Sequence, residues 1–420
     1  MKSEFSKNVI RLSLTTGLSQ AIPFLALPVL QRFFFGPEEF GIYSSFVSIA
    51  SIWISLASFR YEFAIVTEED EQERIRLLLV AISLTFITFL VILILGLLPN
   101  SLFNNIQGLP NGYLYTFFLS ASVLGFSGTQ IISYWLNHSK RFKEIGYGKI
   151  VQSSVSETTK VLSGLYSLGG SGLIGGRIIG QLSSFAWLIY KILPELRGKI
   201  SKHLNYSSLK STFLHHKDYL LYSTPSSVVG TFSNNLHILI PAKLYSNAIV
   251  GNIGVAYIYL AVPAGIVSGS FSQVFFKQVS EISKRSELYE FYIKTATRLF
   301  FFSLPFAIFI QFIPTDWITS LLGESWAPLM IFARMMIWYI LIWFISSALS
   351  FIYIRLKVQK KMLILDISRA SLNIAALLIA HYLYQDPVIT IAFFVVSQII
   401  SYIISILAAL YFIKTSKLLN

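Results

Sequence analysis

Charged side chains within or beside long apolar segments are the residues of this sequence that could do chemistry. The stretch "SFRYEFAIV" at 58–66 places Arg60 and Glu62 where one such segment ends. Arginine stays protonated, and its planar fork donates paired hydrogen bonds to an oxyanion. One interpretation is an anion-binding Arg60 balanced by Glu62. The other is a pair that anchors the chain at a membrane interface.

Two further pairs of opposite charge occur inside apolar segments. Glu157 and Lys160 are three residues apart, as are Asp366 and Arg369. Side chains at this spacing share one helix face. Each pair is therefore either a neutralised ion pair that supports helix packing or part of a binding site, with Glu157 or Asp366 as the carrier of a coupled proton or sodium ion.

Three arginines have no such partner. Arg334 has no acid on its own helix face, so an anionic ligand or a partner on another helix must offset its charge. Arg177 lies near one end of its apolar segment, where its side chain could also extend to the membrane interface. Arg32 follows the first apolar segment and could pair with Glu38 or Glu39. All three are candidate anion-binding residues.

Composition indicates the environment of these charges. Of the 420 residues, 54% are hydrophobic and 13% are charged, about half the charged share of soluble domains. The apolar residues form uninterrupted runs of roughly 20, which match helices that cross a bilayer and not the alternating strands of a membrane barrel. We predict an all-α polytopic membrane protein with twelve transmembrane helices, near 9–29, 40–60, 77–98, 113–136, 148–167, 172–193, 219–243, 250–275, 297–314, 327–354, 362–384 and 388–413.

The basic residues predict the orientation of these helices. Lysine and arginine collect in cytoplasmic loops. If both termini are cytoplasmic, all 33 basic residues lie on the cytoplasmic side except Arg32, Lys160, Arg177, Lys243, Arg334 and Arg369. We therefore predict that both termini are cytoplasmic. The net charge of +13 reflects this topology and does not indicate a nucleic-acid partner.

The longest predicted connection falls at the middle of the chain and suggests two similar halves. We predict an N-terminal six-helix lobe at 1–193, a cytoplasmic linker at 194–218 and a C-terminal six-helix lobe at 219–420. Because each half contains an even number of spans, the halves share one orientation and form a parallel repeat. A substrate is expected in a central cavity between them, near the middle of the membrane.

The N-terminal region resembles a known family. The segment "LPVLQRFFFGPEEFGIYSSFVSI" at 27–49, "FRYEFAIV" at 59–66 and the acidic segment that follows are similar to the polysaccharide-biosynthesis flippases of the multidrug/oligosaccharidyl-lipid/polysaccharide exporter superfamily. The likeness is specific over about residues 10–80. It implies an alternating-access transporter of the bacterial inner membrane. The implied cargo is an undecaprenyl-pyrophosphate-linked oligosaccharide repeat unit of O-antigen, capsule or exopolysaccharide, moved from the cytoplasmic to the periplasmic leaflet.

This resemblance assigns roles to the charged residues. The isoprenoid tail of such a cargo can stay in lipid, but its pyrophosphate and sugars need a polar, cationic cavity. Arg60 would receive the pyrophosphate at the cytoplasmic mouth, and Arg32 would act at the exit. The other expected substrate-binding residues are Lys160, Arg177, Arg334 and Arg369, with Glu62, Glu157 and Asp366 as coupling or charge-balancing groups. The expected partners are this cargo, membrane lipids and the polysaccharide polymerase machinery.

Two other functions remain as alternatives. A cation-coupled multidrug antiporter of the same fold would need buried acids for cationic drugs, whereas the charges here are mainly basic. A membrane glycan polymerase or ligase would need a sizeable extramembrane loop, and no predicted outer loop is long enough. We expect no enzymatic activity and no catalytic residue.

We also expect no cofactor and no metal site. The sequence contains no cysteine and no Walker loop. "GSGLIG" at 170–175 lacks the preceding strand of a dinucleotide site, so Gly172, Gly176 and Gly180 are interpreted as a ridge for close helix packing. His215 and His216 have no neighbouring carboxylate or cysteine in the sequence, so we expect no metal site there.

Overall fold

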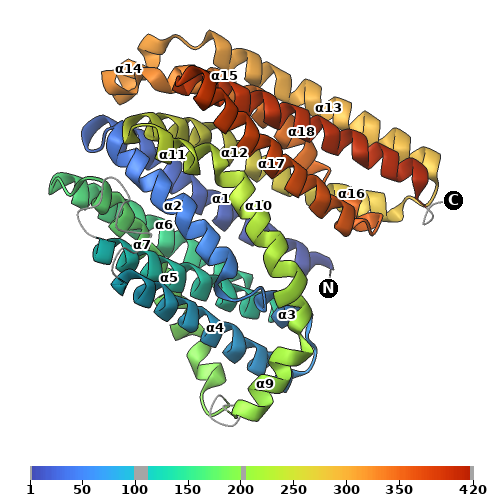
Figure 1. Cartoon of the computed structure of the whole chain (residues 1–420). Coiled ribbons are helices and arrows are strands. Elements are labelled where there is room, and N and C mark those ends of the chain that lie inside the picture. Colours follow the sequence, from blue (N-terminus) through green and yellow to red (C-terminus); the bar gives the residue numbers. More distant parts are fainter. Residues whose placement is uncertain (1, 99–111, 200–204, 417–420) are drawn as a thin grey trace. The chain divides into compact units, whose positions relative to one another are not determined.

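The prediction of an all-α chain is confirmed. The computed structural model describes residues 2–98, 112–199 and 205–416, and these residues contain helices and turns but no strand. The chain divides into two compact units, Met1–Thr231 (unit 1) and Phe232–Asn420 (unit 2) (Figure 1). The bounds of the predicted lobes and linker stay predictions.

Unit 1 contains six long helices, with shorter ones at its turns and in its last segment. The long helices are α1 (Lys2–Phe33), α2 (Pro37–Ala57), α4 (Glu71–Leu97), α5 (Gly112–His138), α6 (Phe142–Leu165) and α7 (Gly169–Leu196). The others are α3 (Glu62–Thr67), α9 (Tyr206–His215), the π-helix η1 (Tyr219–Ser223) and α10 (Thr224–Leu239), which continues into unit 2.

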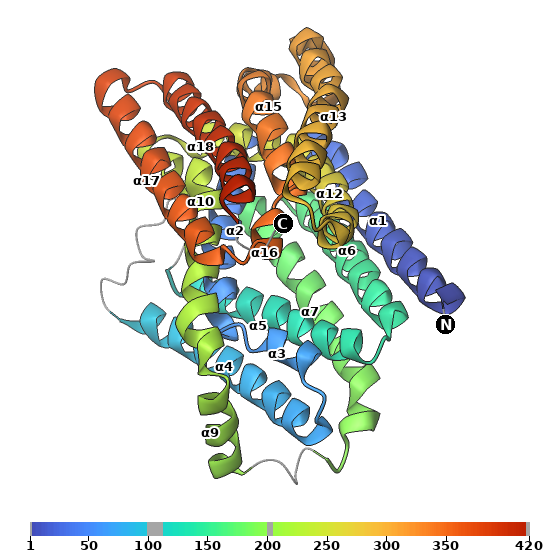
Figure 2. The ribbon, with the colours of Figure 1, turned by 90° about the vertical axis from the view of Figure 1, so that its right-hand side faces the viewer.

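Unit 2 contains five long helices after the end of α10. They are α12 (Asn247–Glu281), α13 (Arg285–Phe312), α15 (Ala327–Ala348), α17 (Gln359–Tyr384) and α18 (Pro387–Thr415). Shorter elements connect them: α11 (Pro241–Leu244), α14 (Thr315–Leu322), the 3-10 helix η2 (Glu324–Trp326) and α16 (Ile352–Arg355). The pair α17 and α18 lies side by side in both views of the chain (Figures 1 and 2).

Helix ends follow local capping chemistry. Gly36 donates its backbone N–H to the Glu39 carboxylate at 2.9 Å, and Pro37 is the first residue of α2. Asp70 accepts hydrogen bonds from the first turn of α4, and Asp386 accepts one from the first turn of α18. These contacts satisfy N–H groups that have no partner inside the helix.

The predicted span near 40–60 ends earlier in the structure, at Ala57. Phe59 and Arg60 have φ values of 48° and 64°, in the left-handed region. Two consecutive non-glycine residues in this region cannot continue a right-handed helix, and each costs about 1–2 kcal/mol. Arg60 therefore lies in a turn between α2 and α3, here called the 58–61 turn.

Nine helices in the described residues are long and apolar enough to cross a membrane. They are α2, α4, α5, α7, α12, α13, the segment Glu324–Arg355, α17 and α18. Helices α1, α6 and α10 occupy the other three predicted windows. A multi-pass membrane protein is therefore indicated, and the full count of twelve spans stays a prediction.

The predicted glycine ridge on α7 is confirmed. A Cβ atom at Gly180 would lie 2.5 Å from the backbone oxygen of Gln152, and one at Gly176 would lie 2.6 Å from Cγ of Lys160. Helices α6 and α7 therefore pack with their backbones in close approach, as small residues allow in membrane helices. This packing also positions Lys160.

The ridge generates a stability prediction. Gly180→Ala should destabilise the protein by about 1–3 kcal/mol, because the backbone oxygen of Gln152 cannot move out of the way of a new methyl group. The measurement is the thermal unfolding midpoint of the purified chain in detergent. The matched control is Gly175→Ala on the same helix, where the added Cβ meets nothing within 4 Å. Equal midpoints for the two variants would show that the ridge does not hold α6 against α7.

Candidate functional site

The 58–61 turn directs the Arg60 side chain into a specific set of contacts. Its guanidinium lies over the Phe63 ring, with 5.1 Å from Cζ to the ring centroid, and it donates a hydrogen bond from Nη2 to Oγ of Ser227 on α10. Nη1 lies 3.6 Å from Oε1 of Glu62. Nε is buried without a hydrogen-bond partner in the described residues. Arg60 therefore keeps a free donor, and 21% of its side chain is exposed.

Glu62 is buried, with 2% of its surface exposed. Ser58 donates a hydrogen bond to Oε2, and Nε2 of Gln130 lies 3.5 Å from Oε1. A buried carboxylate needs a compensating charge, which Arg60 supplies. The structure thus brings together the two residues that the sequence placed at this membrane end.

Tyr61 links the same turn to the segment that follows α7. Its ring is fully buried, stacks on Phe213 of α9 at a centroid distance of 5.4 Å, and donates a hydrogen bond from its hydroxyl to the Phe213 carbonyl at 2.7 Å. Helix α9 packs against α4 (Figure 2). Tyr61 is therefore a packing contact between elements.

A second contact joins this segment to α4. Nε2 of His216 lies 3.7 Å from Glu73 and 4.0 Å from Glu68. Burial lowers the pKa of His216 below its usual value, as does the neighbouring His215, whereas the two glutamates act in the opposite direction. The imidazole is therefore neutral at pH 7. No group of three or more His, Cys, Asp or Glu side chains in the described residues could hold a metal ion.

A cavity of about 380 Å³ lies beside the Arg60–Glu62 pair; its walls are largely apolar, and it is here called the polar cavity for the amide, hydroxyl and ammonium groups among its lining residues. Gln130, which contacts Glu62, is one of its lining residues, and Tyr134, another, packs edge-on against Phe63. The lining comes from α5 and α6 and consists of Phe126, Thr129, Gln130, Ser133, Tyr134, Asn137, Phe142, Ile145, Lys149 and Gln152. Amide, hydroxyl and ammonium groups of this kind suit sugars and anions.

The sequence analysis does not predict Lys149 or the polar side chains of this cavity as site residues. Lys149 is among the basic residues that it assigns to the cytoplasmic side. A signal was present: Gln130, Ser133 and Asn137 recur at spacings of three and four, the period of one helix face. Lys149 and Gln152 are likewise three residues apart on α6. Such a polar stripe within an apolar helix indicates a face that does not contact lipid.

A second cluster in unit 1 brings together three of the predicted residues. Nζ of Lys160 lies 2.7 Å from Oε1 of Glu157 and 5.4 Å from the centroid of the Tyr43 ring on α2. Arg177 on α7 lies near the Tyr43 side chain. Glu157 and Lys160 are buried. Tyr43 therefore lies near two cations, of which Lys160 is paired with a carboxylate.

Unit 2 contains the third pair. Nη2 of Arg369 lies 3.1 Å from Oδ1 of Asp366 on the same helix, and the guanidinium lies over the Tyr402 ring of α18 at 4.9 Å. Arg369 is therefore both neutralised and held against an aromatic face. Whether it contacts a ligand stays a prediction.

Arg334 and Arg32 have different surroundings. Arg334 donates a hydrogen bond to the backbone oxygen of Ile313 at 2.7 Å, and Gln311 donates one to the backbone oxygen of Arg334 at 2.8 Å. Because Ile313 follows the last turn of α13, Arg334 supplies a positive charge at a helix C-terminus. The C-terminal end of α13 is therefore the partner on another helix that the sequence analysis expected for Arg334. Arg32 is exposed in the last turn of α1. Roles for both in substrate binding stay predictions.

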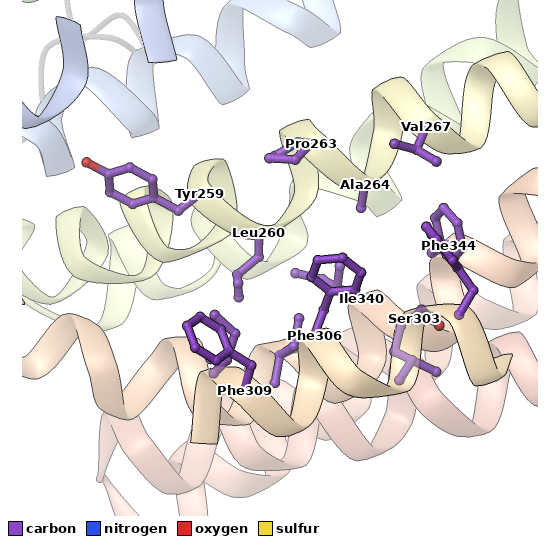
Figure 3. Close-up of a pocket in the computed structure, with 14 residues that line it drawn as sticks. Tyr259, Leu260, Pro263, Ala264, Val267, Ser303, Phe306, Phe309, Ile340 and Phe344 are labelled. Carbon is purple, nitrogen blue, oxygen red and sulfur yellow. The ribbon is translucent and has the colours of Figure 1, made fainter. Parts of the chain in front are cut away.

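An apolar cavity of about 360 Å³ lies within unit 2, between α12, α13 and α15 (Figure 3). Phe306, Phe309 and Phe344 lie along it, and the hydroxyl of Ser303 is already bonded to the backbone oxygen of Leu299 at 2.8 Å. Almost no polar group faces this space. It suits hydrocarbon and cannot recognise a sugar.

The buried pair in unit 1 generates a second prediction. Glu157→Gln should destabilise the protein by about 3–5 kcal/mol, because it leaves the Lys160 ammonium buried without a carboxylate. The double variant Glu157→Gln with Lys160→Met should recover most of this loss, since neither charge remains. Thermal unfolding in detergent measures both effects. A double variant as unstable as the single one would contradict a pairwise role.

The fold is similar to solved membrane transporters. The lipid II flippase MurJ in an inward closed conformation has a TM-score of 0.76 at 18% identity, with 97% of this chain and 88% of that chain covered. An inward-facing multidrug resistance MATE family transporter of the MOP superfamily has a TM-score of 0.72 at 15% identity, with 98% and 99% covered. At these identities the likeness shows the fold alone. No curated protein sequence matches the chain.

The family model described as "Polysaccharide biosynthesis protein" matches residues 29–331. This range covers most of the chain and includes the 58–61 turn, the polar cavity and the Glu157–Lys160 cluster. The predicted resemblance is therefore confirmed on two independent grounds, a sequence family and a fold. The chain belongs to the polysaccharide biosynthesis protein family and has the fold of the MOP-superfamily transporters.

Proposed function

We propose that this protein is a flippase for undecaprenyl-pyrophosphate-linked oligosaccharide repeat units of O-antigen, capsule or exopolysaccharide. It moves them from the cytoplasmic to the periplasmic leaflet of the bacterial inner membrane by alternating access. The observation that carries the proposal is the Arg60–Glu62 pair beside a polar cavity, in a member of a polysaccharide biosynthesis family.

Arg60 has the chemistry to receive a pyrophosphate. Its guanidinium makes a hydrogen bond to a neutral hydroxyl and a long ion pair of 3.6 Å, and its Nε has no partner in the described part of the chain. A pyrophosphate can offer two oxygens to this fork, which Ser227 and Glu62 do not. When a pyrophosphate binds, its negative charge would balance the Arg60 guanidinium in place of Glu62.

The adjacent cavity can hold the first sugars. Gln130 and Asn137 provide amide donors and acceptors, and Tyr134 provides an aromatic side chain. Lys149 adds a positive charge for the pyrophosphate. The isoprenoid tail would remain in the surrounding lipid throughout transport, so it would not have to leave an apolar environment.

The remaining predicted residues complete the proposed path. Lys160 and Arg177 form a cationic cluster with Tyr43, and Arg369 forms a neutralised pair. We propose that these residues and Arg334 contact the anionic cargo along its path and that Arg32 acts at the exit. Glu62, Glu157 and Asp366 balance the charges, or couple transport to an ion.

The state of the carboxylates favours this cargo over the cationic drugs of a multidrug antiporter. Glu62, Glu157 and Asp366 each lie within ion-pairing distance of a basic side chain, at 3.6, 2.7 and 3.1 Å respectively. A cationic drug would have to displace these basic partners. An anionic cargo could instead bind these basic side chains without displacing their carboxylate partners, because arginine and lysine have more N–H donors than one carboxylate uses.

The proposal predicts that Arg60→Ala lowers transport by more than it lowers the amount of membrane-inserted protein, which falls because Glu62 is left buried without its balancing charge. Arg60→Ala should lower surface polysaccharide, normalised to membrane-inserted protein, by at least about tenfold, because hydrogen bonds to a charged group contribute about 1.5–3 kcal/mol. Arg60→Lys should recover only part of the transport, since the paired donors are lost.

Arg334→Ala should also lower this normalised value if Arg334 contacts the cargo.

Two comparisons make this test specific. Ser227→Ala removes the same Arg60 hydrogen bond but keeps the charge, so it should transport nearly normally. For Arg334→Ala, loss of the contact to Ile313 alone would lower protein abundance and activity together. Near-normal normalised transport in Arg60→Ala would remove that residue from the cargo site.

The orientation in the membrane is a separate prediction. The distribution of basic residues places both termini in the cytoplasm. Reporter fusions at Gly169 and Asp386 should therefore respond as periplasmic, and fusions at Tyr206 and Val358 as cytoplasmic. A reversed response at any two of these sites would contradict the proposed direction of the chain.

A further inference from the structure

A buried histidine in unit 2 has no role in the proposed cargo site. His237 lies on α10 and is 2% exposed. Its ring centroid is 4.4 Å from that of Tyr257 on α12 and 5.8 Å from that of Phe394 on α18. The imidazole is therefore enclosed by aromatic side chains from two other helices.

One nitrogen of this imidazole is buried without a partner. Nε2 has no hydrogen-bond partner in the described residues. When the neutral ring carries its proton on Nδ1, Nε2 presents an unshared lone pair.

A second unsatisfied group lies in the same cluster. The ring of Tyr339 on α15 lies 5.7 Å from that of Phe394, the side chain that also packs against His237. The Tyr339 hydroxyl is buried and has no hydrogen-bond partner in the part of the chain that the structure describes. Each such group loses its hydrogen bonds to water and gains none in return, so a cluster that served only for packing would favour apolar side chains here.

In the described residues, no unpaired carboxylate packs against the His237 ring. Tyr257 of α12 packs directly on this ring, and Tyr339 of α15 packs on Phe394, which also contacts it. In the same unit, Arg369 of α17 lies over Tyr402 of α18 and pairs with Asp366. The only carboxylate among these side chains is already paired with Arg369 at 3.1 Å. An imidazolium would therefore be poorly stabilised in this arrangement.

We propose that His237 is a proton-binding site that links protonation to an opening of unit 2 around α10. The Nε2 lone pair takes a proton from a hydronium ion, which leaves water, and no other bond forms or breaks. Because the enclosed site does not stabilise the imidazolium, protonation selects a conformation in which Nε2 meets water. Release of the proton restores the closed arrangement.

This device would let a proton gradient act on the conformational cycle without a carboxylate carrier. It does not rest on the identity of the cargo, because His237 and the aromatic side chains that enclose it lie in unit 2 and take no part in the proposed cargo site. It is also distinct from Glu157 and Asp366, the coupling candidates that the sequence suggested.

The absence of cysteine from the sequence allows a direct test. Ser233 lies one turn before His237 on the same face of α10 and is fully buried. Ser233→Cys in the purified full chain is labelled with a maleimide at pH 7.5 and pH 5.5, with and without His237→Gln. The labelling rate of the His237 protein relative to the His237→Gln protein should rise about tenfold between these pH values, because an exposed histidine has a pKa of about 6.5.

The ratio removes the pH dependence of the thiol itself, which is common to both proteins. The same ratio at both pH values would overturn the proposal.

If Ser233→Cys does not fold, hydrogen exchange in residues 224–239 of the cysteine-free chain gives a second measurement. Exchange corrected for its intrinsic rate should be faster at pH 5.5 than at pH 7.5, and only when His237 is present. Equal protection with and without His237 would likewise overturn it. Neither assay uses a lipid-linked substrate, so their outcome is independent of the flippase proposal.

Discussion

Hydrocarbon offers no hydrogen bonds to a protein, and most features of this chain follow from that constraint. Each backbone N–H and C=O must find its partner within the chain, which favours helices joined by short turns. The helix ends need additional groups, supplied by Glu39, Asp70 and Asp386 at N-termini and by Arg334 after α13. The glycine ridge of α7 then allows backbones to approach where no hydrophobic driving force exists.

The same constraint governs the charged side chains. Lys160 and Arg369 are held beside carboxylates on their own helices, three residues away. Arg60 differs, because its turn conformation lets it reach Glu62 two residues later while it also contacts α10. The same ion pair can both neutralise a buried charge and bind a ligand, because a basic side chain with unused donors can exchange its carboxylate partner for a ligand oxygen.

The three residues 60–62 contact three different elements of unit 1. Arg60 reaches Ser227 of α10, Tyr61 reaches Phe213 of α9, and Glu62 approaches Gln130 of α5. The left-handed conformation of Phe59 and Arg60 turns the chain between α2 and α3 at the point where these contacts are made. A ligand at Arg60 would therefore act on a turn that is already bonded to the segment joining the two halves of the chain.

The sequence by itself determined the features that depend on local patterns. Apolar runs predicted the helices, spacings of three predicted the pairs Glu157–Lys160 and Asp366–Arg369, and small residues at spacings of four predicted the ridge of α7. The N-terminal motifs were also sufficient to identify the family.

Only the tertiary structure decided which groups meet across helices. The contact of Arg60 with Ser227, the position of Lys149 in the polar cavity and the enclosure of His237 join segments far apart in the chain. Hydropathy records how much of a helix is apolar, but not how the helix is rotated against its neighbours. Which polar side chain meets which partner depends on that rotation, and rotation is set by packing over the whole unit.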